Sequence, residues 1–169
     1  MKNDAVAFGK LIQVYRIQLF SYLLRLCGDR MTAEDLFQET LIKVWKGFKS
    51  YNEQSKFSSW LFSIAHNVAV DSIRKESAKN TTPSFDDIQA FSSNNDPHIT
   101  FVEKETNELV MAAVSKLSEK QKQVFLLRQH SGMTFKEISK ETNQPLNTVL
   151  GHMHYAVSKI REKLSKEYG

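Results

Sequence analysis

Apolar side chains recur at intervals of three and four residues along most of this chain, and this spacing restricts the fold to helices. Glycine and proline are scarce, with 6 and 3 copies, and no segment alternates apolar and polar residues as a strand would. The sequence therefore predicts an all-α protein. Helices are expected at residues 5–26, 32–48, 57–75, 102–117, 118–131, 134–142 and 146–166.

One segment, residues 77–98, interrupts the helical pattern. It is rich in Ser, Thr, Asn and Asp, contains two prolines and has a net charge of −2, whereas residues 1–76 and 99–169 each carry +3. A polar stretch without periodicity is typical of a linker. The sequence thus predicts two small helical domains, residues 1–76 and 99–169, joined by a polar, flexible linker at 77–98.

Several helix starts are marked by capping residues. Ser or Thr followed three positions later by an acid or Gln forms a capping box, which occurs at Thr32, Ser118 and Thr134. Ser58 or Ser59 is expected to start the third helix in the same way, by accepting a free backbone N–H group.

Composition excludes several classes of site. The single cysteine, Cys27, allows neither an intrachain disulfide nor a zinc motif, and the five histidines are scattered. There is no Gly-rich phosphate loop, so we expect no catalytic site, no metal and no cofactor. The N-terminus lacks the apolar core of a signal peptide, and no apolar run reaches the roughly 18 residues of a membrane span. A cytoplasmic protein without membrane insertion is expected, and the net charge of +4 permits an anionic partner.

The last two expected helices have the outline of a helix-turn-helix, in which the second helix enters the DNA major groove. A plain helix hairpin fits this pattern equally well. The helix at residues 57–75, FSSWLFSIAHNVAVDSIRK, combines an apolar face with a polar one, and by itself it also fits an ordinary amphipathic helix with a solvated side.

Three motifs taken together resemble one family. AEDLFQETLIKVW (residues 33–45), FSSWLFSIAHNVAVDSIRK and LSEKQKQVFLLRQHSGMTFKEIS (residues 117–139) are similar, in this order, to the extracytoplasmic-function sigma factors of bacterial RNA polymerase, of the sigma-70 family. The resemblance implies a sigma factor that binds core RNA polymerase, recognises and melts promoter DNA and directs transcription initiation. It also implies an anti-sigma factor as a partner. The alternatives are a helix-turn-helix regulator that acts without polymerase, and a helical interaction protein with no nucleic-acid role.

The resemblance also implies three sets of site residues. Polymerase would bind the second helix at Asp35, Gln38, Glu39 and Ile42. The −10 promoter element would be bound by Tyr51, Lys56, Phe57, Ser58, Trp60, Asn67, Asp71, Arg74 and Lys75, with aromatic rings for unstacked bases and cations for the backbone. The −35 element would be read by Asn147, Thr148, Gly151, His152, Tyr155 and Lys159.

The recognition helix departs from the family pattern. Where the family usually has Lys, Ser and Arg after a Thr-Val pair and a further Arg three residues later, this chain has Leu150, Gly151, His152 and Tyr155. Fewer cations mean fewer phosphate contacts. Either these contacts move to Lys159 and Arg161, or base reading relies on Asn147, Thr148 and the histidines.

Overall fold

The computed structural model describes residues 2–52, 56–79 and 101–168, without the side chains of residue 2 and residues 101–106. Within these ranges the chain forms seven helices and no strand, which confirms the all-α prediction. The helices are α1 (Lys2–Cys27), α2 (Arg30–Phe48), α3 (Phe57–Ala78), α4 (Phe101–Ser115), α5 (Glu119–Ser131), α6 (Phe135–Thr142) and α7 (Leu146–Tyr168). Most of the predicted linker lies outside the described residues. No helix in the described ranges has the length and apolar character needed to span a membrane.

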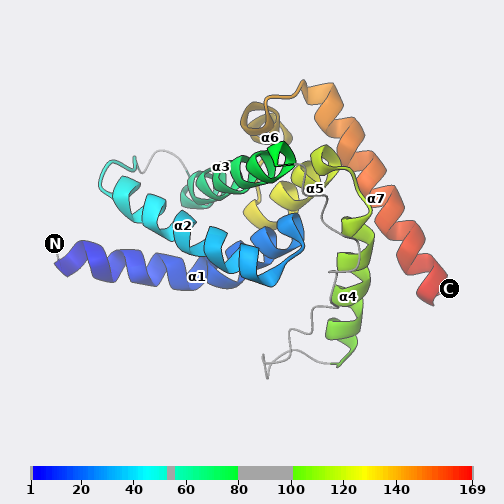
Figure 1. Ribbon diagram of the computed structural model, residues 1–169, viewed down its shortest axis with the longest axis horizontal. Coiled ribbons are helices and arrows are strands. Elements are labelled where there is room, and N and C mark those ends of the chain that lie inside the picture. Colours follow the sequence, from blue (N-terminus) through cyan, green and yellow to red (C-terminus); the bar gives the residue numbers. More distant parts are fainter. Residues whose placement is uncertain (1, 53–55, 80–100, 169) are drawn as a thin grey trace.

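Helices α1, α2 and α3 form a first bundle in which each helix packs against the other two. Figure 1 shows α1 and α2 side by side, joined by a sharp reversal. Gly28 makes this reversal with φ of 77°, a left-handed conformation that glycine adopts without steric cost. The interior is filled by buried side chains from all three helices. They include Leu19, Tyr22, Leu23, Leu36, Val44, Leu61, Phe62 and Ala65.

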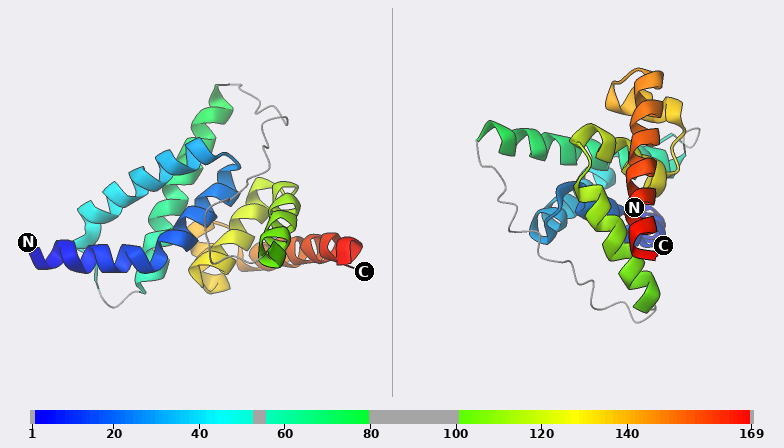
Figure 2. Two further views of the ribbon diagram at one scale, coloured as in Figure 1. Left: turned by 90° about the horizontal axis from the view of Figure 1, so that it is seen from below. Right: turned by 90° about the vertical axis from the view of Figure 1, so that its right-hand side faces the viewer.

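Helices α4 to α7 form a second bundle, in which the long α7 packs against each of the other three. Its buried side chains recur at helical spacing, as the sequence predicted for α7 with Val149, Ala156 and Ile160. Met153 and Leu164, expected in the same stripe, are partly buried against it. The two bundles also touch each other, because α5 packs against α1 and α3. Figures 1 and 2 show α5 between the first bundle and α7.

The predicted caps of the second bundle are correct. The side-chain hydroxyls of Ser118 and Thr134 each accept a hydrogen bond from the backbone N–H three residues on. The backbone N–H of each cap residue in turn donates to the side-chain oxygen of Gln121 or Glu137. Gly132 then ends α5 in a left-handed conformation. These boxes depend only on neighbouring residues, which is why the sequence reveals them.

Two predicted caps in the first bundle are wrong. Helix α2 begins at Arg30, and its cap is Asp29, three residues before the predicted Thr32. The Asp29 carboxylate accepts hydrogen bonds from the Thr32 N–H at 3.0 Å and from the Thr32 hydroxyl at 2.6 Å. These bonds lower the pKa of Asp29. Helix α3 has Lys56 as its N-cap residue and no side-chain cap, and the Ser58 hydroxyl donates instead to the carbonyl of Ser131 at 2.7 Å.

Candidate nucleic-acid and partner interfaces

The predicted polymerase-binding residues lie together on the exposed face of α2. Asp35, Gln38 and Glu39 are exposed, and Ile42 keeps 55% of its surface accessible. The sequence missed Trp45, which follows Ile42 by three residues and is 42% exposed. Neighbouring exposed apolar side chains rimmed by polar groups are typical of a protein docking surface. Trp45 could have been assigned to the face of Ile42 from the sequence, because residues three apart on a helix lie on the same side.

The three aromatic residues predicted to meet unstacked bases form one cluster. The Tyr51 and Trp60 ring centroids are 4.8 Å apart, and Phe57 lies 5.6 Å from Tyr51 and 5.8 Å from Trp60. All three side chains are half-buried. Gly47 of α2 makes room for the cluster, since a Cβ atom there would lie only 3.1 Å from Cζ2 of Trp60. The rings therefore pack the junction of α2 and α3 while leaving part of their surface accessible.

The polar side chains of α3 continue from this cluster along the helix. Asn67, Asp71, Arg74 and Lys75 are exposed, as is Lys56 just before the helix. Ser58 differs from them, because it is half-buried and hydrogen-bonded to the second bundle.

Helices α6 and α7 form the predicted helix-turn-helix. Asn143 ends α6 in a left-handed conformation with φ of 53°, and the backbone N–H of Gln144 donates to the carbonyl oxygen of Ser139 at 3.1 Å. Arg128 holds the loop between α5 and α6. Its guanidinium donates to the carbonyl of Met133 at 2.7 Å and lies 4.8 Å from the centre of the Phe135 ring. The Asn143 and Gln144 contacts close the turn before α7, and the Arg128 contacts hold the loop before α6.

The outward face of α7 carries most of the predicted −35 residues. Asn147, Thr148, Gly151, Tyr155 and Lys159 are exposed, and His152 is half-buried. Gly151 has open space where a side chain would project.

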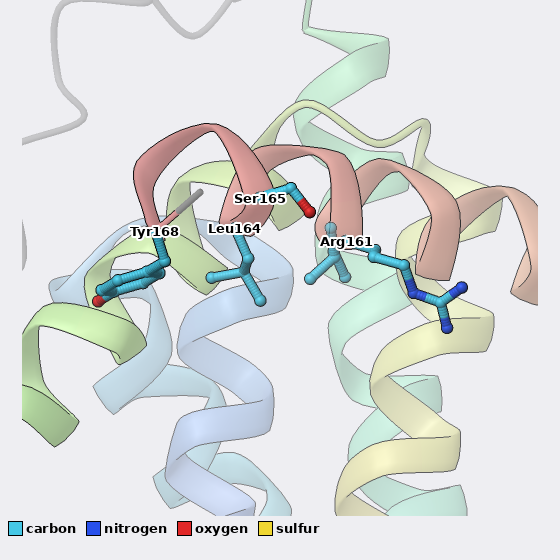
Figure 3. Close-up of a pocket in the computed structure, with 5 residues that line it drawn as sticks. Arg161, Leu164, Ser165 and Tyr168 are labelled. Carbon is cyan, nitrogen blue, oxygen red and sulfur yellow. The ribbon is translucent and has the colours of Figure 1, made fainter.

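Lys159 and Arg161, the two cations expected to take over phosphate contacts from the recognition helix's missing ones, lie in different surroundings on α7. The Lys159 ammonium lies 5.5 Å from the Tyr155 ring centroid and 3.9 Å from a Glu162 oxygen, so its charge is partly offset. Arg161 lines an open groove near the end of α7 together with Leu164, Ser165 and Tyr168 (Figure 3). Its guanidinium extends away from Leu164 and Tyr168 in this view.

Two histidines that appeared scattered in the sequence meet at Tyr22, a contact that sequence reasoning missed. The Tyr22 hydroxyl lies 3.1 Å from Nδ1 of His66, and the His130 ring lies 6.3 Å from the Tyr22 ring. Burial lowers the pKa of His66 to about 4, and burial together with Arg25 lowers that of His130 to about 4. Burial also raises the pKa of Tyr22, so its neutral hydroxyl donates to a neutral imidazole at physiological pH.

The fold and these surfaces define an all-helical DNA-binding protein with a helix-turn-helix in its second bundle and an aromatic and basic surface on its first. Residues 11–79 match the model of sigma-70 region 2, and residues 107–160 match that of sigma-70 region 4. The chain belongs to the sigma-70 family and is a sigma factor of the extracytoplasmic-function group.

Several relatives align over nearly the whole chain. The extracytoplasmic-function sigma factor SigW of Bacillus subtilis is 26% identical over 96% of this chain and 91% of its own length. SigL of Mycobacterium tuberculosis is 26% identical over 96% of this chain and 92% of its own length. Among solved structures, the sigma factor RpoE in complex with the anti-sigma factor NepR from Bartonella quintana has a TM-score of 0.74 at 22% identity, covering 94% of this chain and 97% of that one. CnrH, solved with the cytosolic domain of CnrY, has a TM-score of 0.62 at 19% identity, covering 96% and 90%.

Proposed function

We propose that this sigma factor binds core RNA polymerase through the exposed face of α2 and carries the polymerase to promoters, where it starts transcription. The observation that supports this most is the match to sigma-70 regions 2 and 4, in that order, in one chain. A regulator acting alone would need the helix-turn-helix but not a region 2 surface. The protein would act in the cytoplasm as a subunit that directs an enzyme, without catalytic activity of its own.

The first bundle is proposed to capture and melt the −10 element. The half-exposed rings of Tyr51, Phe57 and Trp60 offer flat surfaces to bases that leave the stack, and stacking of this kind is worth about 1–3 kcal/mol per base. Arg74 and Lys75 would hold the phosphates of the same strand. In this proposal the buried part of each ring packs α2 against α3, and its exposed part contacts a base.

The second bundle is proposed to read the −35 element with the outward face of α7. Asn147 and Thr148 lie in the first turn of this helix, which is the part that meets base edges in a helix-turn-helix. Residues 1–76 and 99–169 would thus work as separate domains joined by the linker at 77–98. An anti-sigma factor is a further proposed partner, because RpoE and CnrH, which share this fold, were solved with bound partners.

The proposal is tested by adding purified protein to core RNA polymerase and measuring co-purification and run-off transcription from the DNA upstream of its own gene. Association with core enzyme and a specific transcript are expected. A protein that binds this DNA but does not associate with core enzyme at low salt would instead be a regulator acting alone.

The α2 surface is tested by the double substitution Gln38→Ala with Glu39→Ala. Both side chains are exposed, so the variant should fold normally and bind core polymerase more weakly. Glu119→Ala with Gln129→Ala is the matched control, since it removes the same two exposed residue types from α5. Equal affinity of the α2 variant and the wild type for core enzyme would show that the face is wrongly assigned.

A further inference from the structure

Helix α7 exposes two leucines in its first two turns, the part of a helix-turn-helix that meets DNA. Leu146 keeps 37% of its surface accessible and Leu150 keeps 42%. Val149, the residue before Leu150, is in contrast fully buried. The two leucines are four residues apart, so they lie one turn apart along the same side of the helix. Neighbouring exposed apolar side chains of this kind are typical of a surface that binds another molecule.

Leu150 lies beside residues that are proposed to read the −35 element. Asn147 precedes it by three positions and Gly151 follows it directly, and both are exposed. Residues three apart on a helix are neighbours, so an amide and an aliphatic side chain lie next to each other here. Open space lies where a Cβ atom would project from Gly151. A glycine at this point allows the backbone of α7 to come close to a ligand.

The residues around Leu150 fit DNA better than they fit a protein partner. The centre of a protein interface is usually built from several large apolar side chains. On the outward side of Leu150 the helix instead carries Asn147, Gly151 and Ser158, which are small or polar and exposed. A helix with such a strip can lie close against the base edges of the major groove. Leu150 then stands at the border of the strip, within reach of the same base pairs.

The major groove offers a leucine one matching group, the 5-methyl group of thymine. Every other group on the base edges there is a hydrogen-bond donor or acceptor, which an aliphatic side chain would remove from water without replacing its bond. The side-chain amide of an asparagine, in turn, forms two hydrogen bonds with adenine. Thymine and adenine are partners in one base pair. Asn147 and Leu150 are therefore both suited to A·T base pairs.

We propose that Leu150 is a specificity-determining residue, which contacts the 5-methyl group of a thymine in the −35 element beside the adenine that Asn147 reads. The proposal rests on the proposed function, since it assigns the reading of this element to α7. The contact selects thymine over cytosine and over uracil, which both lack the methyl group. Because Leu150 is uncharged, the contact adds to specificity and not to the salt-dependent affinity for phosphate. Burial of one methyl group corresponds to a change in affinity of about fourfold.

The test uses the full chain bound to core RNA polymerase. Duplexes are first selected from a random-sequence pool with the wild type, and the upstream block that the selected duplexes share defines the −35 element. Each thymine of this block is then replaced in turn by uracil, which pairs with adenine in the same way but lacks the methyl group. Fluorescence anisotropy measures the affinity for each duplex. At least one replacement should weaken binding of the wild type about fourfold, and the same replacement should leave the affinity of Leu150→Ala unchanged.

Two further variants separate the apolar contact from other effects. Leu150→Met keeps a flexible apolar side chain and should keep the response to uracil. Ile17→Ala shortens an aliphatic side chain that is 71% exposed on α1, and this matched control should respond as the wild type does. Circular dichroism verifies that each variant is folded.

Three results would overturn the assignment of Leu150 while leaving promoter binding intact. They are a wild type that is indifferent to every uracil, a Leu150→Ala variant that keeps the response, and a response that Leu150→Ala and Leu150→Met change alike. The proposed function fails in a different way, because the wild type would then not associate with core polymerase or would select no shared sequence. In that case the assignment of Leu150 fails with it.

Discussion

Protonation of His66 should destabilise the folded chain as the pH falls from 6.5 towards 4. The ring is 3% exposed and accepts a hydrogen bond from Tyr22, and burial lowers its pKa from 6.5 to about 4. Because the folded pKa lies below the unfolded value, the folded state binds fewer protons than the unfolded state within this window. Stability is therefore complete above pH 6.5 and is lost progressively below it, with no further loss from this group once the pH is below about 4.

The size of this loss follows from the two pKa values. The full difference corresponds to about 3 kcal/mol, and at pH 5 about 2 kcal/mol of it has been lost. His130, whose pKa is also lowered to about 4, adds a comparable loss, so the wild type alone does not isolate His66. The informative variant is His66→Gln, because its amide oxygen still accepts a hydrogen bond from the Tyr22 hydroxyl but does not titrate.

The assay is urea unfolding followed by far-ultraviolet circular dichroism at pH 7.5 and pH 5. His66→Gln is expected to lose about 2 kcal/mol less than the wild type between these two conditions. His154→Gln, which removes an exposed imidazole from α7, reports what the loss of a histidine does at the surface. If His66→Gln and the wild type lose the same free energy of unfolding, the imidazole is not held neutral by burial and the reasoning is refuted.

Glycine substitutions test packing and DNA contact. Gly47→Ala should lower stability by about 1–3 kcal/mol, because the added Cβ would lie 3.1 Å from Trp60, whereas Gly9→Ala meets no neighbour and should raise stability by about 0.5–1 kcal/mol. Thermal unfolding measures both, and a gain at Gly47 would contradict the close approach of α2 and α3. Gly151→Arg places a cation in open space on the outward face of α7 and should steepen the salt dependence of duplex DNA binding by about 0.9 in the log–log slope. Anisotropy over a series of salt concentrations measures this slope, and an unchanged slope would mean that this face does not meet phosphate.

The helices were predictable because their signals are local. Periodic apolar residues and the boxes at Ser118 and Thr134 specify helix position within a few neighbouring residues. The start of α2 was predicted wrongly from the same kind of local signal, because Thr32 was taken as the cap although Asp29 is an equally good cap residue. Asp29 prevails because its carboxylate accepts two hydrogen bonds from Thr32, a geometry that the spacing alone does not reveal.

The features that the sequence did not predict depend on residues far apart in the chain. Ser58 was expected to cap its own helix, but its partner is a carbonyl 73 positions later. In the sequence His66 is one of several isolated histidines, and its partner Tyr22 lies on α1, 44 positions away. No window of neighbouring residues contains such contacts, and they arise only when the bundles pack.

The two proposed DNA surfaces are unequally charged. On α3, Arg74 and Lys75 are exposed, and neither forms an ion pair with another described residue. On α7, Lys159 lies next to Glu162, which also pairs with Lys166 at 3.2 Å, so the carboxylate offsets part of the charge near the recognition face. Phosphate contacts provide much of the affinity of a DNA complex, whereas base contacts provide its specificity. Unless Arg161, which is exposed on α7 and forms no ion pair with another described residue, also meets phosphate, the first bundle should therefore contribute more of the electrostatic affinity for promoter DNA. The contribution of α7 should then rest more on uncharged groups such as Asn147 and Thr148.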